Sequence, residues 1–331
     1  MFRFGLILTL AVFVGCDAGS SGDPAAPADK TIRIAVVPKS TGHEFWQAVR
    51  AGAQRAADEL DDVEIIWKGP QSESDTAGQI SIVKNFITKQ VDGICLAPTQ
   101  SKALVDVVIE ANDEGIPVVV FDSGLGEGAE YVSYVATDNF SGGKLAGHRL
   151  AEVLDSKGEV ILLRYRAGSE STEQRESGFL EVMEEYPDIK VLSSDQYGEA
   201  TTESAMKKAT SLLLKYQDEV DGIFAVCEPN CNGTLEALEQ SGLAGKIHFV
   251  AFDPSDGLID GLRDGKVAGI VLQDPVTMGY QSVMATVAHI RGEEVEAVIS
   301  TGEYVATKEN MSQAPFDRLI KPTLFGEDAT P

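Results

Sequence analysis

The sequence predicts an α/β protein made of two doubly wound parallel-sheet lobes joined by a three-strand hinge. Short strands rich in Val and Ile alternate with longer helical segments, a pattern typical of parallel sheets with right-handed crossovers. The tetrapeptide VDGI occurs at 91–94 and again at 220–223, each time ahead of a strand that ends in aspartate. The chain has 331 residues, which is enough for two lobes of common domain size.

The predicted elements follow a similar order in the two halves. The first half opens with the strand TIRIAVV and the second with GEVILLR. Val and Ile occupy both faces of these strands, as sheets covered by helices on both sides require. The expected helices span 45–60, 76–89, 102–114, 172–185, 201–215 and 232–240.

The chain is expected to pass between the lobes at three places, near 137–138, 273–274 and 301–303. Each lobe then contains segments that are distant in sequence, and the three connections act as a hinge. The expected lobes are 31–137 with 274–301 and 138–273 with 302–325, followed by a tail at 326–331.

The N-terminus predicts export. Arg3 precedes an apolar run that is too short to cross a bilayer of roughly 30 Å as a helix but suits a signal peptide over residues 1–15. The sequence VFVGC resembles a bacterial lipobox, which implies cleavage before Cys16, lipid attachment to it, and a location in the periplasm or at the cell surface. Residues 16–30 are small, polar and Pro-containing, as a flexible tether requires. The alternative is an ordinary secretory signal with an incidental Cys16.

Charge and composition exclude nucleic acid as a partner. The formal net charge is −25, and no cluster of Lys and Arg is present to meet a phosphate backbone. We interpret the acidity as a solvated surface that keeps an exported protein soluble. We expect a monomer without cofactor or metal, attached to the membrane only through its lipid.

Polar and aromatic side chains follow several of the predicted strands at the point where each strand ends. Ligands bind outside the carboxyl ends of parallel strands in open α/β sheets, so these side chains outline a small polar pocket. They indicate a binder of a small hydroxylated molecule. The residues concerned are Lys39, Phe45, Trp46, Asp122, Cys227, Asp253 and Gln273.

The cysteines carry little chemistry. Cys95 lies in a strand-like segment, where it is expected to be a small buried hydrophobic residue. Cys227 and Cys231 are four residues apart at a strand-to-helix turn, so a disulfide and two free thiols both remain open in an oxidising compartment. No histidine lies nearby in sequence, which disfavours a metal site.

A family resemblance extends from about residue 31 to residue 310. The matching pieces, in order, are EFWQAVRAGAQRAADEL, IPVVVFDS, ATDNFSGGKLAG, STEQRESGF, VDGIFAV, VAFDPSDGLIDGL and GIVLQDPVTMGY. Their joint order resembles the periplasmic ribose-binding proteins, the type 1 sugar-binding proteins of ABC importers. The resemblance implies capture of a monosaccharide or polyol between two lobes and delivery to an ABC permease.

The resemblance also implies roles for particular residues. Phe45 and Trp46 match an aromatic pair that stacks on the apolar face of a sugar ring. Asp122 and Asp253 match aspartates that accept hydroxyl hydrogen bonds, and charge-assisted bonds of this kind are strong. Arg175 matches an arginine that bridges a carboxylate and a ring oxygen.

Two further matches and three departures complete the expected site. Tyr197 matches an aromatic wall and Gln273 a hinge amide. The family's asparagine, arginine and second asparagine fall here on His43, Ser123 and Cys227, so ribose is not the expected ligand. We expect Lys39 to supply the cation that the missing arginine would have given Asp122, because a buried carboxylate is costly without a partner.

Two alternatives to a transport role are a sensor or regulator and a glycosidase. A sensor that presents ligand to a chemoreceptor or histidine-kinase ectodomain has the same sequence signature, whereas a repressor is excluded because a signal stands where a helix-turn-helix would lie. A glycosidase would use Asp122 and Asp253, but one of them must stay protonated. Arg175 and Lys39 are expected to keep both ionised, which favours binding over catalysis.

Overall fold

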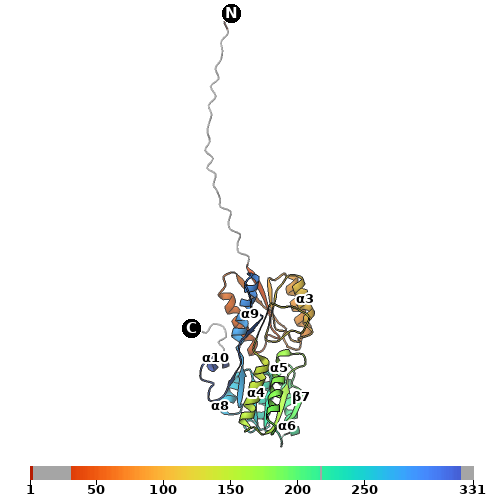
Figure 1. Ribbon diagram of the computed structural model, residues 1–331, viewed down its shortest axis with the longest axis vertical. Helices are drawn as coiled ribbons and strands as arrows, with labels where there is room; N and C mark the ends of the chain where they lie inside the picture. Colours follow the sequence, from red (N-terminus) through yellow and green to blue (C-terminus); the bar gives the residue numbers. More distant parts are fainter. Residues whose placement is uncertain (3–30, 217, 322–331) are drawn as a thin grey trace. The chain divides into compact units, whose positions relative to one another are not determined.

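The computed structural model describes residues 1–2, 31–216 and 218–321, and from Thr31 onward the chain forms two six-stranded sheets with flanking helices (Figure 1). The first sheet contains β1 (Ile32–Val37), β2 (Val63–Trp67), β3 (Gly93–Leu96), β4 (Val118–Phe121), β5 (Ser133–Ala136) and β11 (Val298–Ser300). The second contains β6 (Gly158–Arg164), β7 (Ile189–Tyr197), β8 (Gly222–Ala225), β9 (His248–Phe252), β10 (Gly269–Leu272) and β12 (Tyr304–Ala306).

The two sheets have corresponding topologies. The first has the order β11-β5-β4-β3-β1-β2 and the second the order β12-β10-β9-β8-β6-β7. The paired strands run parallel, except that β12 runs antiparallel to β10. The fold class predicted from the sequence is therefore confirmed.

The six expected helices are all present, with shifted ends. In particular, α7 begins four residues earlier than expected because Pro229, in its first turn, needs no hydrogen bond there. The first lobe contains α1 (Glu44–Asp58), α2 (Thr76–Thr88), α3 (Val105–Asp113) and α9 (Pro275–Ile290). The second contains α4 (Asn139–Val153), α5 (Glu170–Glu185), α6 (Thr202–Tyr216), α7 (Glu228–Gln240), α8 (Asp256–Asp264) and α10 (Phe316–Ile320).

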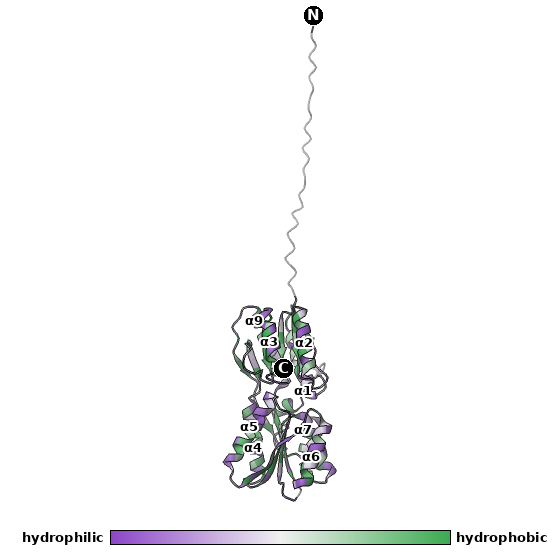
Figure 2. Ribbon diagram, turned by 90° about the vertical axis from the view of Figure 1, so that its right-hand side faces the viewer, coloured by the Kyte–Doolittle hydropathy of each residue, from purple (hydrophilic) through white to green (hydrophobic). Residues whose placement is uncertain are grey.

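The hydrophobic core lies on both faces of each sheet. In β1, Ile34 and Val36 join one buried cluster, whereas Ala35 and Val37 join another on the opposite face. Hydrophilic residues colour the outer faces of the helices and hydrophobic residues lie toward the strands (Figure 2). None of the helices within the described part of the chain is long and apolar enough to cross a membrane.

The chain passes between the sheets at three places, after β5, after β10 and after β11. The first two crossings lead directly into helices that begin with an aspartate cap. Asp138 accepts a hydrogen bond from the Ser141 N–H (2.9 Å) and Asp274 one from the Thr277 N–H (3.0 Å). The predicted signal peptide (from residue 3), the tether with Cys16 and the tail lie outside the described residues.

Glycines let the helices that follow the crossings approach their neighbours at backbone distance. A Cβ added to Gly279 of α9 would overlap the carbonyl oxygen of Val49 in α1, and one added to Gly52 of α1 would overlap that of Val276 in α9. The second lobe repeats this arrangement between α4 and α5. There Gly143 meets the carbonyl of Arg175, and Gly178 meets that of Phe140.

Replacing a contact glycine should loosen one lobe. We expect Gly279→Ala to destabilise the protein by about 1 to 3 kcal/mol, because the added methyl forces α1 and α9 apart. Gly257→Ala is the matched control: Gly257 is exposed at the start of α8 with open space where a Cβ would lie, so the stability of this variant should be unchanged or rise by up to about 1 kcal/mol. Urea unfolding measures both, and equal midpoints for the two variants would contradict the close-contact interpretation.

Candidate ligand-binding site

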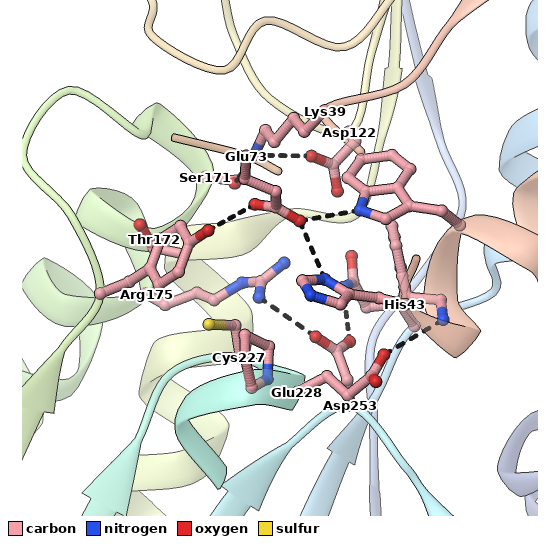
Figure 3. A pocket seen from close by; sticks show the side chains of 15 residues that line it. Lys39, His43, Glu73, Asp122, Ser171, Thr172, Arg175, Cys227, Glu228 and Asp253 are labelled. Carbon is pink, nitrogen blue, oxygen red and sulfur yellow. Dashed lines mark hydrogen bonds and ion pairs between the residues drawn. The ribbon is translucent and has the colours of Figure 1, made fainter. Parts of the chain in front are cut away.

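A polar pocket with a free volume of about 30 Å³ lies where the carboxyl ends of strands from the two sheets face each other. Figure 3 shows the side chains that surround it. The lining residues are Lys39, His43, Phe45, Trp46, Glu73, Asp122, Tyr165, Ser171, Thr172, Arg175, Cys227, Glu228, Pro229, Asp253 and Gln273.

Nine of the eleven predicted ligand-binding residues line this pocket, and Ser123 and Tyr197 do not. Ser123 is buried, and its hydroxyl accepts a hydrogen bond from the backbone N–H of Ser171 (3.0 Å). Tyr197 ends the edge strand β7, beside Arg164 of β6, so its ring is one strand too far from the pocket. Tyr165, directly after β6, lines the pocket instead.

Lys39 and Asp122 form a buried ion pair in the first lobe. Lys39 follows β1, Asp122 follows β4, and Lys39 Nζ lies 2.8 Å from Asp122 Oδ2 in an ion pair rather than an aligned hydrogen bond. Lys39 also donates to the hydroxyl of Ser171 in the second lobe (2.9 Å). Asp122 has a φ of 62°, a left-handed conformation that Asp and Asn adopt more readily than other side chains.

Arg175 and Asp253 form the corresponding pair in the second lobe. Asp253 also has a left-handed φ (67°), and its Oδ2 lies 3.6 Å from Arg175 Nη1. The guanidinium stacks 3.8 Å from the ring centroid of Phe252, and Gln273 donates to Asp253 Oδ1 (2.7 Å). Burial nevertheless raises the pKa of Asp253 against the opposing effects of Arg175 and Gln273. Arg175 and Gln273 therefore oppose the effect of burial on Asp253 without cancelling it.

Glu73 is a pocket residue that the sequence analysis missed. It lies in the polar loop between β2 and α2, where neither a strand end nor a hydrophobic pattern marks it. Its Oε1 accepts from Trp46 Nε1 (2.8 Å) and lies 3.2 Å from His43 Nδ1, while Oε2 accepts from the Tyr165 hydroxyl (2.6 Å). Burial alone would raise the pKa of Glu73, but the hydrogen bond with His43 and the charge of Lys39 lower it to about 2.

Trp46 serves as a core residue as well as a pocket wall. Its side chain is buried in the first-lobe core, edge-on to Phe45 at 4.9 Å and to Phe121 at 6.3 Å between ring centroids. Its indole N–H is used by Glu73. Phe45 is less buried, so it presents the more accessible ring to a ligand.

Glu228 is a second acidic pocket residue that the sequence analysis missed, and its charge interacts with that of His43. Glu228 begins α7 directly after the predicted site residue Cys227, so extending the strand-end argument by one residue would have found it. Its Oε2 accepts the backbone N–H of Phe45 (3.2 Å). Burial raises the pKa of Glu228 to about 7, opposed by the charge of His43. Burial has the largest single effect on the pKa of His43 and lowers it, but the hydrogen bond and charge of Glu73 together with the charges of Glu228 and Asp253 make the net shift upward.

The disulfide between Cys227 and Cys231 is not formed, because their side chains point to different surroundings. Cys227 lines the pocket, whereas the Sγ of Cys231 lies within hydrogen-bonding distance of the carbonyl oxygens of Ala225 (3.1 Å) and Phe252 (3.3 Å). Burial raises the pKa of both thiols. No group of three or more His, Cys, Asp or Glu side chains in the described ranges is placed to hold a metal ion.

Direct hydrogen bonds between the lobes close the pocket. Besides the Tyr165–Glu73 and Lys39–Ser171 bonds, the Gly124 N–H donates to Glu170 Oε2 (2.8 Å). The Ser101 N–H donates to the Gly168 carbonyl (2.9 Å). The structure is thus one in which both lobes contact each other around the polar pocket.

This fold and pocket define a two-lobed binding protein for a small polar molecule. A family model described as a periplasmic binding protein domain matches residues 34–294, and the chain belongs to this family.

Several relatives align over nearly their full length. The ribose import binding protein of Haemophilus influenzae is 30% identical over 88% of this chain and 95% of its own. A xylitol-binding protein of Mycolicibacterium smegmatis is 27% identical over 92% of this chain and 85% of its own. Among solved structures, an ABC transporter solute binding protein from Agrobacterium vitis with bound D-fucose has a TM-score of 0.84 and 32% identity, covering 87% of this chain and 100% of that one.

Glu176 supports the pocket from behind. It follows Arg175 in α5, and its Oε1 accepts the backbone N–H of Tyr165 (3.1 Å), the residue whose hydroxyl reaches Glu73. Its Oε2 accepts from Arg164 Nη1 (2.8 Å). Burial nevertheless raises the pKa of Glu176 from 4.5 to about 7.

This raised pKa predicts a pH dependence of stability. Because the folded-state pKa lies above the unfolded value, the contribution of Glu176 is present below pH 4.5 and is lost as the pH rises through 7. Glu176→Gln cannot ionise, so its stability relative to wild type should improve by up to about 3 kcal/mol between pH 4.5 and pH 8. Urea unfolding at both pH values measures the change, with exposed Glu184→Gln on the same helix as control. A pH-independent difference would contradict the prediction.

Proposed function

We propose that this protein is an exported, lipid-anchored substrate-binding protein. In this proposal it captures a monosaccharide or a similar polyol between its lobes and delivers it to the permease of an ABC importer. The observation that carries the proposal is the matched pair of buried aspartates, Asp122 and Asp253, at equivalent strand ends. Each lies beside a cation, Lys39 or Arg175, and they face the same pocket. Two carboxylates accept hydrogen bonds from several hydroxyl groups at once.

The relatives support the same ligand class. Their names specify ribose and xylitol, and the bound ligands of similar structures include D-fucose and, in a protein from Agrobacterium radiobacter at 33% identity and a TM-score of 0.84, D-arabinose. The side chains at His43, Ser123 and Cys227 differ from those that the ribose-binding resemblance implies. We therefore propose a sugar or polyol other than ribose, bound against the ring of Phe45.

The proposal excludes catalysis. Glycoside cleavage needs one carboxylic acid positioned to protonate a leaving group. Here Asp122 is held by Lys39 and Asp253 by Arg175 and Gln273, so both act as fixed acceptors. The relatives are likewise named as binding proteins.

The anchor rests on sequence alone, because Cys16 lies outside the described residues. The lipobox-like VFVGC and the small, polar residues that follow support cleavage before Cys16 and its acylation. Cys16→Ser should release the protein from membranes, and mass spectrometry of the wild type should show an acylated N-terminal cysteine. An unmodified, freely soluble wild-type protein would overturn the anchor.

Ligand binding is tested by thermal-shift screening of the mature protein against a panel of monosaccharides and polyols, followed by calorimetry. Asp253→Ala should weaken the best ligand about 10- to 100-fold or more, because each stranded polar partner costs about 1 to 3 kcal/mol. Tyr197→Phe is the control and should bind normally, since Tyr197 does not line the pocket. Normal binding by Asp253→Ala would show that this pocket is not the ligand-binding site.

Lobe closure is the expected mechanism, because the pocket walls come from both lobes. Ligand should reduce the radius of gyration in small-angle scattering by favouring the closed state. Trp46 touches the pocket and should change its fluorescence, whereas Trp67, at the end of β2, should not. Trp46→Phe should remove most of the signal and keep the compaction. Unchanged scattering with a tight ligand would show that the lobes do not close.

A further inference from the structure

The hydrogen-bond donors that line the pocket are largely occupied by the protein itself. Lys39 Nζ contacts Asp122 Oδ2 and donates to the Ser171 hydroxyl, and both Trp46 Nε1 and the Tyr165 hydroxyl donate to Glu73. Arg175 also uses its guanidinium within the protein, since Nε donates to Asn139 Oδ1 (2.9 Å) and Nη1 to the carbonyl of Val226 (2.9 Å). A ligand therefore finds few free donors.

The acceptors are less well satisfied, and Glu228 is the clearest case. Among the described residues, each of the other three pocket carboxylates has a basic partner within 4 Å: Asp122 has Lys39, Asp253 has Arg175 and Glu73 has His43. Glu228 forms no such pair there and accepts a single backbone N–H, from Phe45. Only 8% of the surface of Glu228 is exposed, so water does little to stabilise its negative charge in the absence of a paired cation.

Gln273 provides an independent second observation. Its Nε2 is used by Asp253, while its Oε1 is buried without a hydrogen-bond partner in the described part of the chain. The residue is 2% exposed and lines the pocket. A buried carbonyl oxygen without a donor costs free energy, so a ligand that donates to it gains affinity.

We propose that the preferred ligand carries an ammonium group, as an amino sugar or an aminated polyol does, and that this group pairs with Glu228. The inference rests on the proposed function and deepens it by naming the ligand's charge. A hydroxyl donates one hydrogen bond and its oxygen also accepts hydrogen bonds, whereas an ammonium donates three hydrogen bonds and accepts none. It therefore matches a pocket with spare acceptors, supplies the cation that Glu228 lacks, and leaves a hydroxyl or a further N–H of the ligand for Gln273 Oε1.

The electrostatic setting supports this pairing. Without ligand, burial raises the pKa of Glu228 to about 7, which marks a carboxylate that is costly to ionise in the site as it stands. His43, whose charge lowers the pKa of Glu228, lies 3.2 Å from Glu73 through its Nδ1 and is engaged there. A ligand cation beside Glu228 would offset the cost of its ionised form.

The test compares sugars that differ only at one substituent, by calorimetry on the mature protein at pH 7.5. The probes are D-glucosamine against D-glucose and N-acetyl-D-glucosamine, and D-galactosamine against D-galactose, with D-ribose and D-arabinose as neutral pentoses. We expect at least one amino sugar to bind at least 10-fold more tightly than its hydroxyl partner, and the neutral N-acetyl form to lose this advantage.

Two variants locate the effect. Glu228→Gln keeps the shape of the side chain and removes its charge, so the ratio of amino-sugar affinity to neutral-sugar affinity should fall at least 10-fold. Glu236→Gln removes one exposed carboxylate from the same helix outside the pocket and should change neither.

The outcomes separate the inference from the function on which it rests. If neutral sugars bind as tightly as their amino partners, or if Glu228→Gln retains the amino-sugar preference, the ammonium inference is wrong and the sugar-binding function stands. If no sugar or polyol binds, either among these probes or in the thermal-shift panel, the proposed function fails and the inference fails with it.

Discussion

Backbone contact between two helices in each lobe is the constraint on which the pocket depends. In the first lobe α1 and α9 meet through Gly52 and Gly279, and in the second α5 and α4 meet through Gly178 and Gly143. One helix of each pair follows a hinge crossing, while the other carries pocket side chains, including Trp46 on α1 and Arg175 on α5. The same contacts thus fix the hinge and orient the binding residues, since packed backbones leave little room for either helix to shift.

Much of the fold was predictable because the repeated sequence motif occupies equivalent positions in the two lobes. The aspartates of the two VDGI segments, Asp92 and Asp221, each accept the backbone N–H of a residue early in the first strand of their half, Arg33 of β1 in one case and Glu159 of β6 in the other. The repeated VDGI sequence therefore corresponds to a repeated tertiary hydrogen bond. The glycine contacts were not predictable in this way, because a single glycine in a helix carries no sign of the carbonyl that it will meet.

The site was predictable where chain position alone determines proximity. Strand ends in a parallel sheet meet at one edge, which brought Lys39, Asp122 and Gln273 to the pocket. Tyr197, which the family resemblance implied, does not line the pocket, because it ends β7 and β7 is an edge strand. Glu73 escaped notice because a loop residue reaches a site through the path of its loop, which a single sequence does not specify.

The left-handed backbone at Asp122 and Asp253 has a consequence for how binding specificity can change. Side chains branched at Cβ fit that conformation poorly, so replacement by Val, Ile or Thr would strain the turn as well as alter the pocket. Asparagine and glycine are the substitutions that the turn accommodates with little strain. An evolutionary or engineered change of ligand would then begin at neighbours whose backbone is ordinary, with the two carboxylates as a fixed frame around which the remaining contacts are exchanged.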